Sequence, residues 1–292
     1  MKKIILCGQL AVSLSSFAQL PDTDIFLADI KNDHGKISFS IPVNITSRTG
    51  YDNQPSFTPD GKSLLFVAVK DTTQSDVYSY DFSSKKITQV TKTMESEYSP
   101  SWSPDKKNIS VVRVDKDSGQ RFYNLPISQL NNARVVKGTD SIGYYCWLND
   151  SLLAMFILGK ANTLQVVNTH TSERKLIAGD IGRCMKADTE KKNMLFVIKQ
   201  NENEWGILKM NITSFAVTKI VSTLKGNEDF AIMPDGNLLM GSEGKLYQYK
   251  PGSDEDWKQV ADFSTTLKTF YRISINAKGN KIAFVAYTGK KP

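Results

Sequence analysis

Residues able to recognise a ligand recur along the chain in short groups, at intervals of roughly 40–45 residues. The groups combine tyrosines, carboxylates, amides and two arginines: Asn53, Gln54, Glu97, Tyr98, Tyr144, Arg183, Glu228, Asp229, Tyr271 and Arg272. Aromatic rings and arginine side chains dominate the binding energy of protein interfaces, and carboxylates accept hydrogen bonds from hydroxyl groups. If the fold brings these groups together, the mixture suits a protein loop, a peptide end or a sugar.

Catalysis has weaker support in the same residues. A serine hydrolase of the common type needs a Gly-x-Ser-x-Gly elbow with a partner histidine, and the sequence has no such elbow. Both histidines, His34 and His170, fall in expected turns. We therefore expect no catalytic residue and no cofactor. The alternative is a polysaccharide lyase with a tyrosine or arginine base, for which the candidates are Tyr98, Tyr144, Arg183 and Arg272.

An internal repeat must position these residues. Six segments share one pattern, in which an apolar or aromatic residue is followed by a tight polar turn and then by an apolar strand. The turn is anchored at Asp60, Asp105, Asp150, Glu190, Asp235 and Lys278, with spacings of 40 to 45 residues. A period of this length is that of a four-stranded propeller blade.

The details of each repeat agree with a blade. Asp60-Gly61 and Asp235-Gly236 are dipeptides that favour a hairpin turn between a first and a second strand. Alternating polarity at 76–81 and 245–249 predicts third strands. The residue three positions before the anchor is a large apolar group in most repeats. We expect this stripe to fill the space between neighbouring sheets. Its members are Phe57, Trp102, Trp147, Ala187, Ile232 and Ile275.

The two ends of the chain each supply half a blade. Residues 272–275 and 281–286 form only two strands of the last repeat, whereas 24–30 and 37–45 resemble a third and a fourth strand. Pairing the halves closes a ring and leaves no sheet edge exposed. The sequence thus predicts an all-β fold, a six-bladed β-propeller of four-stranded antiparallel blades whose last blade is completed by N-terminal strands.

The repeat also resembles a known family. Residues 55–60 (PSFTPD) and 100–105 (PSWSPD) are similar to the WD-like repeat of the TolB propeller domain and its exported relatives, and residues 233–236 match in part. The third, fourth and sixth repeats lack the Pro-Asp pair. The resemblance covers nearly all of the chain after residue 18. It bears on the fold more directly than on the function. TolB has an additional N-terminal α/β domain without counterpart here, so the role of TolB in the cell envelope does not transfer.

The propeller geometry locates a candidate site. Loops that enter the innermost strands of a propeller gather around the central channel, so we expect a channel mouth built from residues 50–55, 94–99, 140–145, 180–184, 226–230 and 268–272. Six residues before the anchors stand Gln54, Ser99, Tyr144, Cys184, Asp229 and Arg272. The ligand-binding groups named at the outset fall at or beside these positions.

The N-terminus predicts export. Lys2 and Lys3 precede an apolar stretch from 4 to about 14, and Ser16 and Ala18 fit the small residues of a cleavage site after Ala18. We expect a signal peptide at 1–18 and a single propeller domain at 19–292, in the periplasm or secreted, with no membrane span. The net charge of +7 is dispersed, which argues against nucleic acid. The expected partner is a protein or peptide of the cell envelope, and a glycan is the other possibility.

Two cysteines remain after such a cleavage, Cys146 and Cys184. The repeat places them in the innermost strands of adjacent blades, where either a disulfide or two buried free thiols would fit. Two scattered cysteines and two distant histidines do not supply a zinc site, so no metal is expected.

Overall fold

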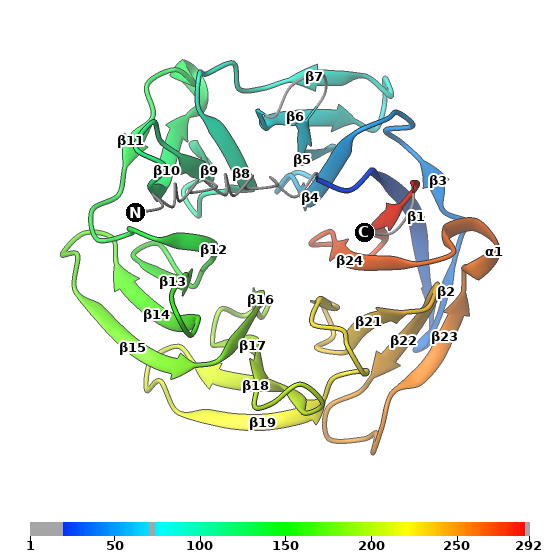
Figure 1. Cartoon of the computed structure of the whole chain (residues 1–292). Coiled ribbons are helices and arrows are strands. Elements are labelled where there is room, and N and C mark those ends of the chain that lie inside the picture. The colour runs from blue at the N-terminus through cyan, green and yellow to red at the C-terminus, as the bar shows by residue number, and fades with distance from the viewer. Residues whose placement is uncertain (1–19, 70–73, 290–292) are drawn as a thin grey trace, which may run out of the picture.

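The sequence repeats fold as β-sheets arranged around a central axis, as Figure 1 shows. This computed structural model describes residues 20–69 and 74–289. The predicted signal peptide at 1–18 lies outside the described residues. We number the sheets as blades 1 to 6 from strand β4 onward, so that blade 6 combines the two chain ends. The predicted all-β six-bladed propeller is confirmed.

Blades 1 to 3 are each a four-strand meander that runs outward from the axis. Blade 1 contains β4 (Tyr51–Phe57), β5 (Ser63–Val69), β6 (Asp76–Asp81) and β7 (Ile87–Gln89). Blade 2 contains β8 (Ser96–Trp102), β9 (Asn108–Val114), β10 (Gln120–Pro126), the 3-10 helix η1 (Ile127–Gln129) and β11 (Arg134–Val135). Blade 3 contains β12 (Ile142–Trp147), β13 (Leu152–Ile157), β14 (Thr163–Asn168) and β15 (Arg174–Gly179).

Blades 4 and 5 repeat this order, and blade 6 is assembled from both ends. Blade 4 contains β16 (Ile181–Ala187), β17 (Asn193–Lys199), β18 (Trp205–Asn211) and β19 (Val217–Ser222). Blade 5 contains β20 (Phe230–Ile232), β21 (Leu238–Ser242), β22 (Lys245–Tyr249) and β23 (Lys258–Asp262). Helix α1 (Ser264–Leu267) leads to blade 6, with β24 (Phe270–Ile275), β25 (Lys281–Tyr287), β1 (Thr23–Asp33), β2 (Lys36–Phe39) and β3 (Val43–Asn44). None of the described helices is both long enough and apolar enough to cross a membrane.

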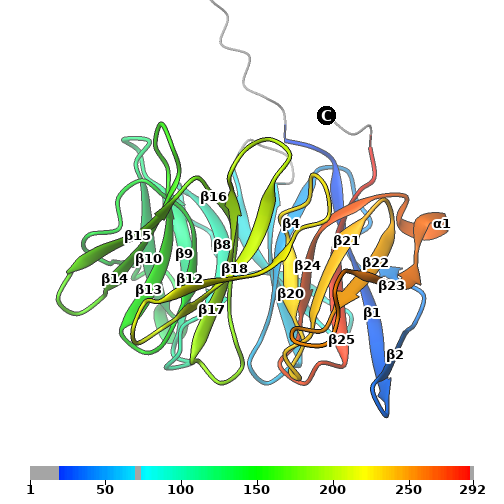
Figure 2. The same ribbon diagram turned by 90° about the horizontal axis from the view of Figure 1, so that it is seen from below.

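The ring closes by antiparallel pairing of β1 with β25, from Thr23 opposite Tyr287 to Asp29 opposite Lys281. The sequence-based division of blade 6 is thus confirmed. The outer strand expected over 37–45 is instead two short strands, β2 and β3, which both pair with β1. Between them lies Pro42, which has no N–H to give to a ladder. Figure 2 shows the β1–β2 hairpin extending beyond one face of the ring.

The core consists of six separate hydrophobic clusters, each packed between two neighbouring blades. Alternate residues of a second strand point to opposite neighbours, as strand geometry requires. In β5, Leu64 and Phe66 face blade 6, whereas Leu65 faces blade 2. Second strands are therefore mostly apolar, with a buried exception at Ser110 of β9. The predicted apolar stripe packs at these interfaces through Phe57, Trp102, Trp147, Ile232 and Ile275.

Most of the anchored turns share one backbone conformation, and the turn after Asp150 in the third repeat is the exception. The residue after the anchor has a positive φ at Gly61 (68°) and Gly236 (85°), as the Asp-Gly pairs predicted, but also at Lys106 and Lys191 (both 56°). In the second repeat the Asp105 carboxylate accepts a hydrogen bond from the Lys107 N–H at 2.8 Å. The turn thus forms without glycine where a carboxylate supports it, although a side chain in this region costs roughly 1–2 kcal/mol.

This conformation gives a stability prediction. We expect Lys106→Gly to raise the free energy of unfolding by about 0.5–1 kcal/mol, since glycine adopts the positive φ without steric cost. The matched control is Lys107→Gly, at a neighbouring position without a positive φ, which should lower it by a similar amount. Urea unfolding measures both, and equal destabilisation by the two variants would contradict the explanation.

Candidate functional site

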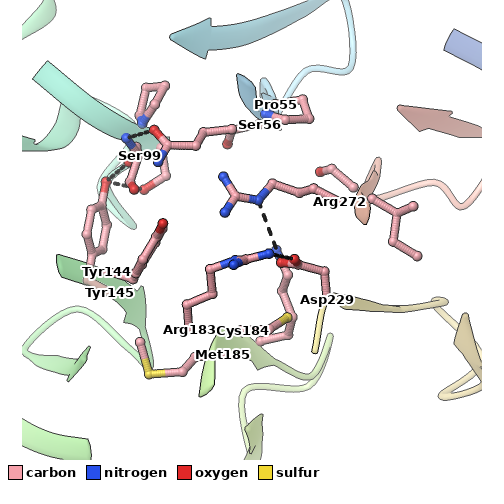
Figure 3. A pocket seen from close by; sticks show the side chains of 16 residues that line it. Pro55, Ser56, Ser99, Tyr144, Tyr145, Arg183, Cys184, Met185, Asp229 and Arg272 are labelled. Carbon is pink, nitrogen blue, oxygen red and sulfur yellow. Dashed lines mark hydrogen bonds and ion pairs between the residues drawn. The ribbon is translucent and has the colours of Figure 1, made fainter. Parts of the chain in front are cut away.

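The innermost strands enclose a cavity of about 160 Å³ on the axis of the ring (Figure 3). All six positions that lie six residues before the turn anchors line it: Gln54, Ser99, Tyr144, Cys184, Asp229 and Arg272. Arg183 also lines it. An adjoining cavity of about 310 Å³ shares Arg183 and Asp229 and is lined as well by Glu228 and Tyr271.

The remaining predicted residues behave differently. Asn53 is almost fully buried and accepts a hydrogen bond from Arg272. It therefore holds a lining residue in place without lining the cavity itself. Glu97 and Tyr98 do not line either cavity. The Glu97 side chain is buried and accepts a hydrogen bond from the Thr93 hydroxyl, and Tyr98 packs against the cluster between blades 2 and 3.

The expected position of these residues in loops was wrong for most of them. Only Glu228 and Asp229 precede their strand, β20, whereas the others lie within innermost strands. The strands begin earlier than expected because their ladders continue past a break in register. Such breaks occur between Asn53 and Ser56, Tyr98 and Ser101, Ile142 and Tyr144, Ile181 and Met185, and Phe270 and Arg272.

These breaks are β-bulges, which turn side chains out of the regular alternation. At two of them a non-glycine residue takes a left-handed conformation, with φ of 56° at Gln54 and 53° at Ser99. The Gln54 side chain accepts a hydrogen bond from the Ser99 N–H at 2.6 Å, which joins blades 1 and 2 at the cavity. Strained residues of this kind persist where the surroundings enforce them and often occur at binding sites.

A second layer of the cavity was missed by the sequence analysis. Ser56, Ser101, Lys186 and Ser274 line it, each four residues before its anchor. Side chains on one face of a strand recur at every second residue. The residues four positions before the anchors therefore follow from those six positions before them, and the second layer could have been predicted from the same anchors.

Arg183 is fixed by two carboxylates. Its Nη1 lies 2.9 Å from Glu228 Oε1, and its Nη2 pairs with Asp229. Glu228 is itself held by the Arg183 N–H at 2.9 Å and by Lys199 Nζ at 3.1 Å. A Cβ at Gly182 would lie only 2.6 Å from Glu228 Oε2, so glycine at this position admits the carboxylate.

Arg272 is held more loosely. Its Nη1 donates to Asn53 Oδ1 at 2.9 Å, and its Nε lies 3.6 Å from Asp229 Oδ1. The guanidinium lies 5.5 Å from the centre of the Tyr144 ring and extends into the open space (Figure 3). Burial is the largest single effect and disfavours the charged form of Arg272, but Asp229 and the nearby tyrosines together outweigh burial and raise the pKa of Arg272. Arg272 is therefore a permanent cation that faces the cavity.

Cys146 and Cys184 are free thiols. Cys146 packs between blades 3 and 4, whereas Cys184 packs between blades 4 and 5, so the sheet of blade 4 separates them. The possible Cys146–Cys184 disulfide is therefore not formed. Burial raises the pKa of the Cys184 thiol to about 12 and also raises that of Cys146, which keeps both protonated and unreactive.

Both histidines lie in exposed turns outside the cavity lining. His34 is in the exposed turn between β1 and β2, and His170 is in the exposed turn between β14 and β15. Neither lines the cavity. Among residues 20–69 and 74–289, no three His, Cys, Asp or Glu side chains form a group that could hold a metal ion.

Comparison with solved structures identifies the type of propeller. A putative TolB from Agrobacterium tumefaciens matches with a TM-score of 0.69 at 11% sequence identity, over 92% of this chain and 99% of that one. TolB from Acinetobacter baumannii matches with a TM-score of 0.59 at 13% identity, over 91% of this chain. The match covers 65% of that TolB, so this chain spans less than two-thirds of its length. The fold is therefore a TolB-like propeller.

An enzyme shares the same architecture. An oligogalacturonate lyase in complex with manganese matches with a TM-score of 0.50 at 13% identity, over 92% of this chain and 98% of that one. No protein-family model matches the sequence, and no match was found among the curated proteins. At such low identities the likeness concerns the fold, and the function must be argued from the cavity.

The buried Glu97 gives a prediction of pH dependence. Burial raises the pKa of its carboxyl group from 4.5 to about 7. The folded state therefore holds a proton that the unfolded state releases, and the contribution of Glu97 to stability is lost as the pH rises from about 4.5 to 7. We expect Glu97→Gln to stabilise the protein by about 1–3 kcal/mol at pH 8 and to have little effect at pH 4.5.

The matched control is Glu202→Gln, at an exposed carboxylate, which should leave the pH dependence of stability unchanged. Thermal unfolding at both pH values distinguishes the two variants. A Glu97→Gln effect that is the same at pH 4.5 and pH 8 would contradict an ionisation-linked cost.

Proposed function

We propose that this protein is an exported, non-catalytic binding module that takes up part of a protein or peptide partner at its central channel. The observation that carries the proposal is Arg272, a cation that lines an axial cavity and whose ion pair with Asp229 is long, at 3.6 Å. The TolB-like fold supports a binding role, and the N-terminal sequence supports export. A glycan is the alternative ligand.

The cavity is built for recognition rather than for nucleophilic attack. A serine nucleophile requires a base within hydrogen-bonding distance. Among the described residues, the lining serines have no histidine or carboxylate as hydrogen-bond partner, and Ser101 instead contacts the Tyr145 hydroxyl at 2.9 Å. Asp229, the carboxylate of the cavity, is engaged by Arg183 and Arg272.

The alternative function is a carbohydrate lyase. The solved lyase with the same architecture supports it, as does the proximity of Tyr144 and Arg272. That structure contains manganese, and the described residues of this chain offer no group of metal ligands for such an ion.

A double variant tests the binding role. We expect Tyr144→Ala with Arg272→Ala to weaken binding of fluorescent random hexapeptides at least tenfold, since it removes an aromatic wall and the cation of the cavity. Fluorescence polarisation measures the affinity. The matched control is Arg174→Ala, which removes one exposed positive charge from the outer strand β15 and should leave binding unchanged.

The competing functions give different results in the same experiment. Cleavage of a uronic-acid polysaccharide into unsaturated fragments, abolished by the double variant, would replace the binding module with a lyase. Absence of peptide binding by the wild-type protein would refute the proposal outright.

Export is testable separately. We expect the protein recovered from the periplasm or medium of a bacterial host to begin at Gln19, because Ala18 fits the last position before cleavage. Intact mass and N-terminal sequencing measure this. Ala18→Arg should block processing at the cleavage site. Ala11→Arg would instead interrupt the apolar stretch. Retention of residues 1–18 in the exported wild type would contradict the prediction.

A further inference from the structure

The charge of the axial cavity is unbalanced. Its lining includes three cationic side chains, Arg183, Lys186 and Arg272, but a single carboxylate, Asp229. The nearby Glu228 does not correct the imbalance, because it is paired with both Arg183 and Lys199. A cavity with excess positive charge favours an anionic ligand.

The two arginines have different capacities. Arg183 pairs with Glu228 and Asp229 through its two terminal nitrogens, which leaves no open fork. Arg272 uses Nη1 for a neutral amide and has a long contact from Nε to Asp229, and its Nη2 has no partner among the described residues. A guanidinium with an open edge matches the planar, two-oxygen geometry of a carboxylate.

The surroundings of Arg272 favour a monoanion. Asp229 lies 3.6 Å from its Nε and already offsets part of its charge, so a doubly charged phosphate would meet a nearby repulsive carboxylate. A carboxylate carries one charge and needs only the open edge. Tyr144 beside the guanidinium, and the Ser56 and Ser274 hydroxyls in the same lining, add an aromatic wall and hydrogen-bonding groups.

The cavity that Arg272 lines has room for one residue. Its volume of about 160 Å³ is roughly half of the smallest pockets that enclose drug-sized ligands. One amino-acid side chain or a chain end is of this scale, and the adjoining cavity of about 310 Å³ leaves space for the chain that carries it. The inner strands that surround the cavity come from all six blades, so a ligand would enter along the axis.

We infer that the axial cavity binds a carboxylate of an extended peptide on the open edge of Arg272. This inference rests on the proposed binding function and specifies the chemistry of its ligand. Asn53 and Asp229 act as positioning residues that orient the guanidinium. The carboxylate can come from a chain terminus or from an aspartate or glutamate side chain, which share the same recognition.

Three pools of N-terminally fluorescein-labelled random hexapeptides separate the sources. The first pool lacks Asp and Glu and ends in a free carboxylate, the second lacks them and ends in an amide, and the third ends in an amide but has a central Glu. With the full-length protein as isolated, we expect the first or the third pool to bind at least tenfold more tightly than the second, as measured by fluorescence polarisation.

Substitutions of Arg272 test whether this residue is responsible for the preference for a carboxylate. Arg272→Ala should abolish the preference for a carboxylate, and Arg272→Lys, which keeps the charge but loses the planar fork, should reduce it by about three- to tenfold. Arg174→Ala should retain it. Thermal unfolding of each variant checks that the fold is intact, and Arg272→Lys remains informative if Arg272→Ala fails to fold.

The outcomes distinguish this inference from the proposed binding function on which it rests. Tighter binding of the first pool supports the inference with a chain terminus as the source, and tighter binding of the third supports it with an acidic side chain. Equal binding of all three pools would overturn the carboxylate inference and leave the binding module in place. Failure of every pool to bind would overturn both.

Discussion

Pairing of β1 with β25 is the interaction on which the architecture depends. Each blade buries both faces of its sheet against its neighbours, in clusters that no blade completes alone. An open row of blades would leave two apolar faces in water, one at each end. The strands at the chain ends remove both faces at once, because β1 completes blade 6 and its residues Phe26 and Ile25 pack toward blades 5 and 1, respectively. Closure is therefore a condition for the stability of every other interface.

The same packing explains why so much of the fold was predictable from the sequence. An interface between blades needs apolar residues at fixed distances from a turn, so Phe57, Trp102 and Trp147 recur in register with the anchors. The halves of blade 6 were recognisable because neither end could stand as a blade alone. The break at Pro42 was harder to foresee, since 37–45 has the length and composition of one strand.

The candidate site was less predictable, because bulges depend on backbone geometry more than on residue type. Nothing in the types of Gln54 and Ser99 signals a left-handed conformation, in contrast to the glycines of the turns. The sequence correctly placed the residues six positions before each anchor at the cavity. It did not predict which residues they pair with. The burial of Glu97 and the pairing of Arg183 with Glu228 arise from contacts between different strands and loops, which a repeat period does not encode.

The separation between channel and interfaces has an evolutionary consequence. The residue three positions before each anchor does not line the cavity, as Trp147 illustrates in β12, whereas the residue six positions before each anchor does. A substitution of a lining residue that belongs to no interblade cluster, such as Gln54 or Arg272, alters one sector of the site while the apolar stripe is unchanged. Selection can therefore change the lining sector by sector on a constant scaffold, which accounts for TolB and an oligogalacturonate lyase sharing one architecture with this chain at identities of 11–13%.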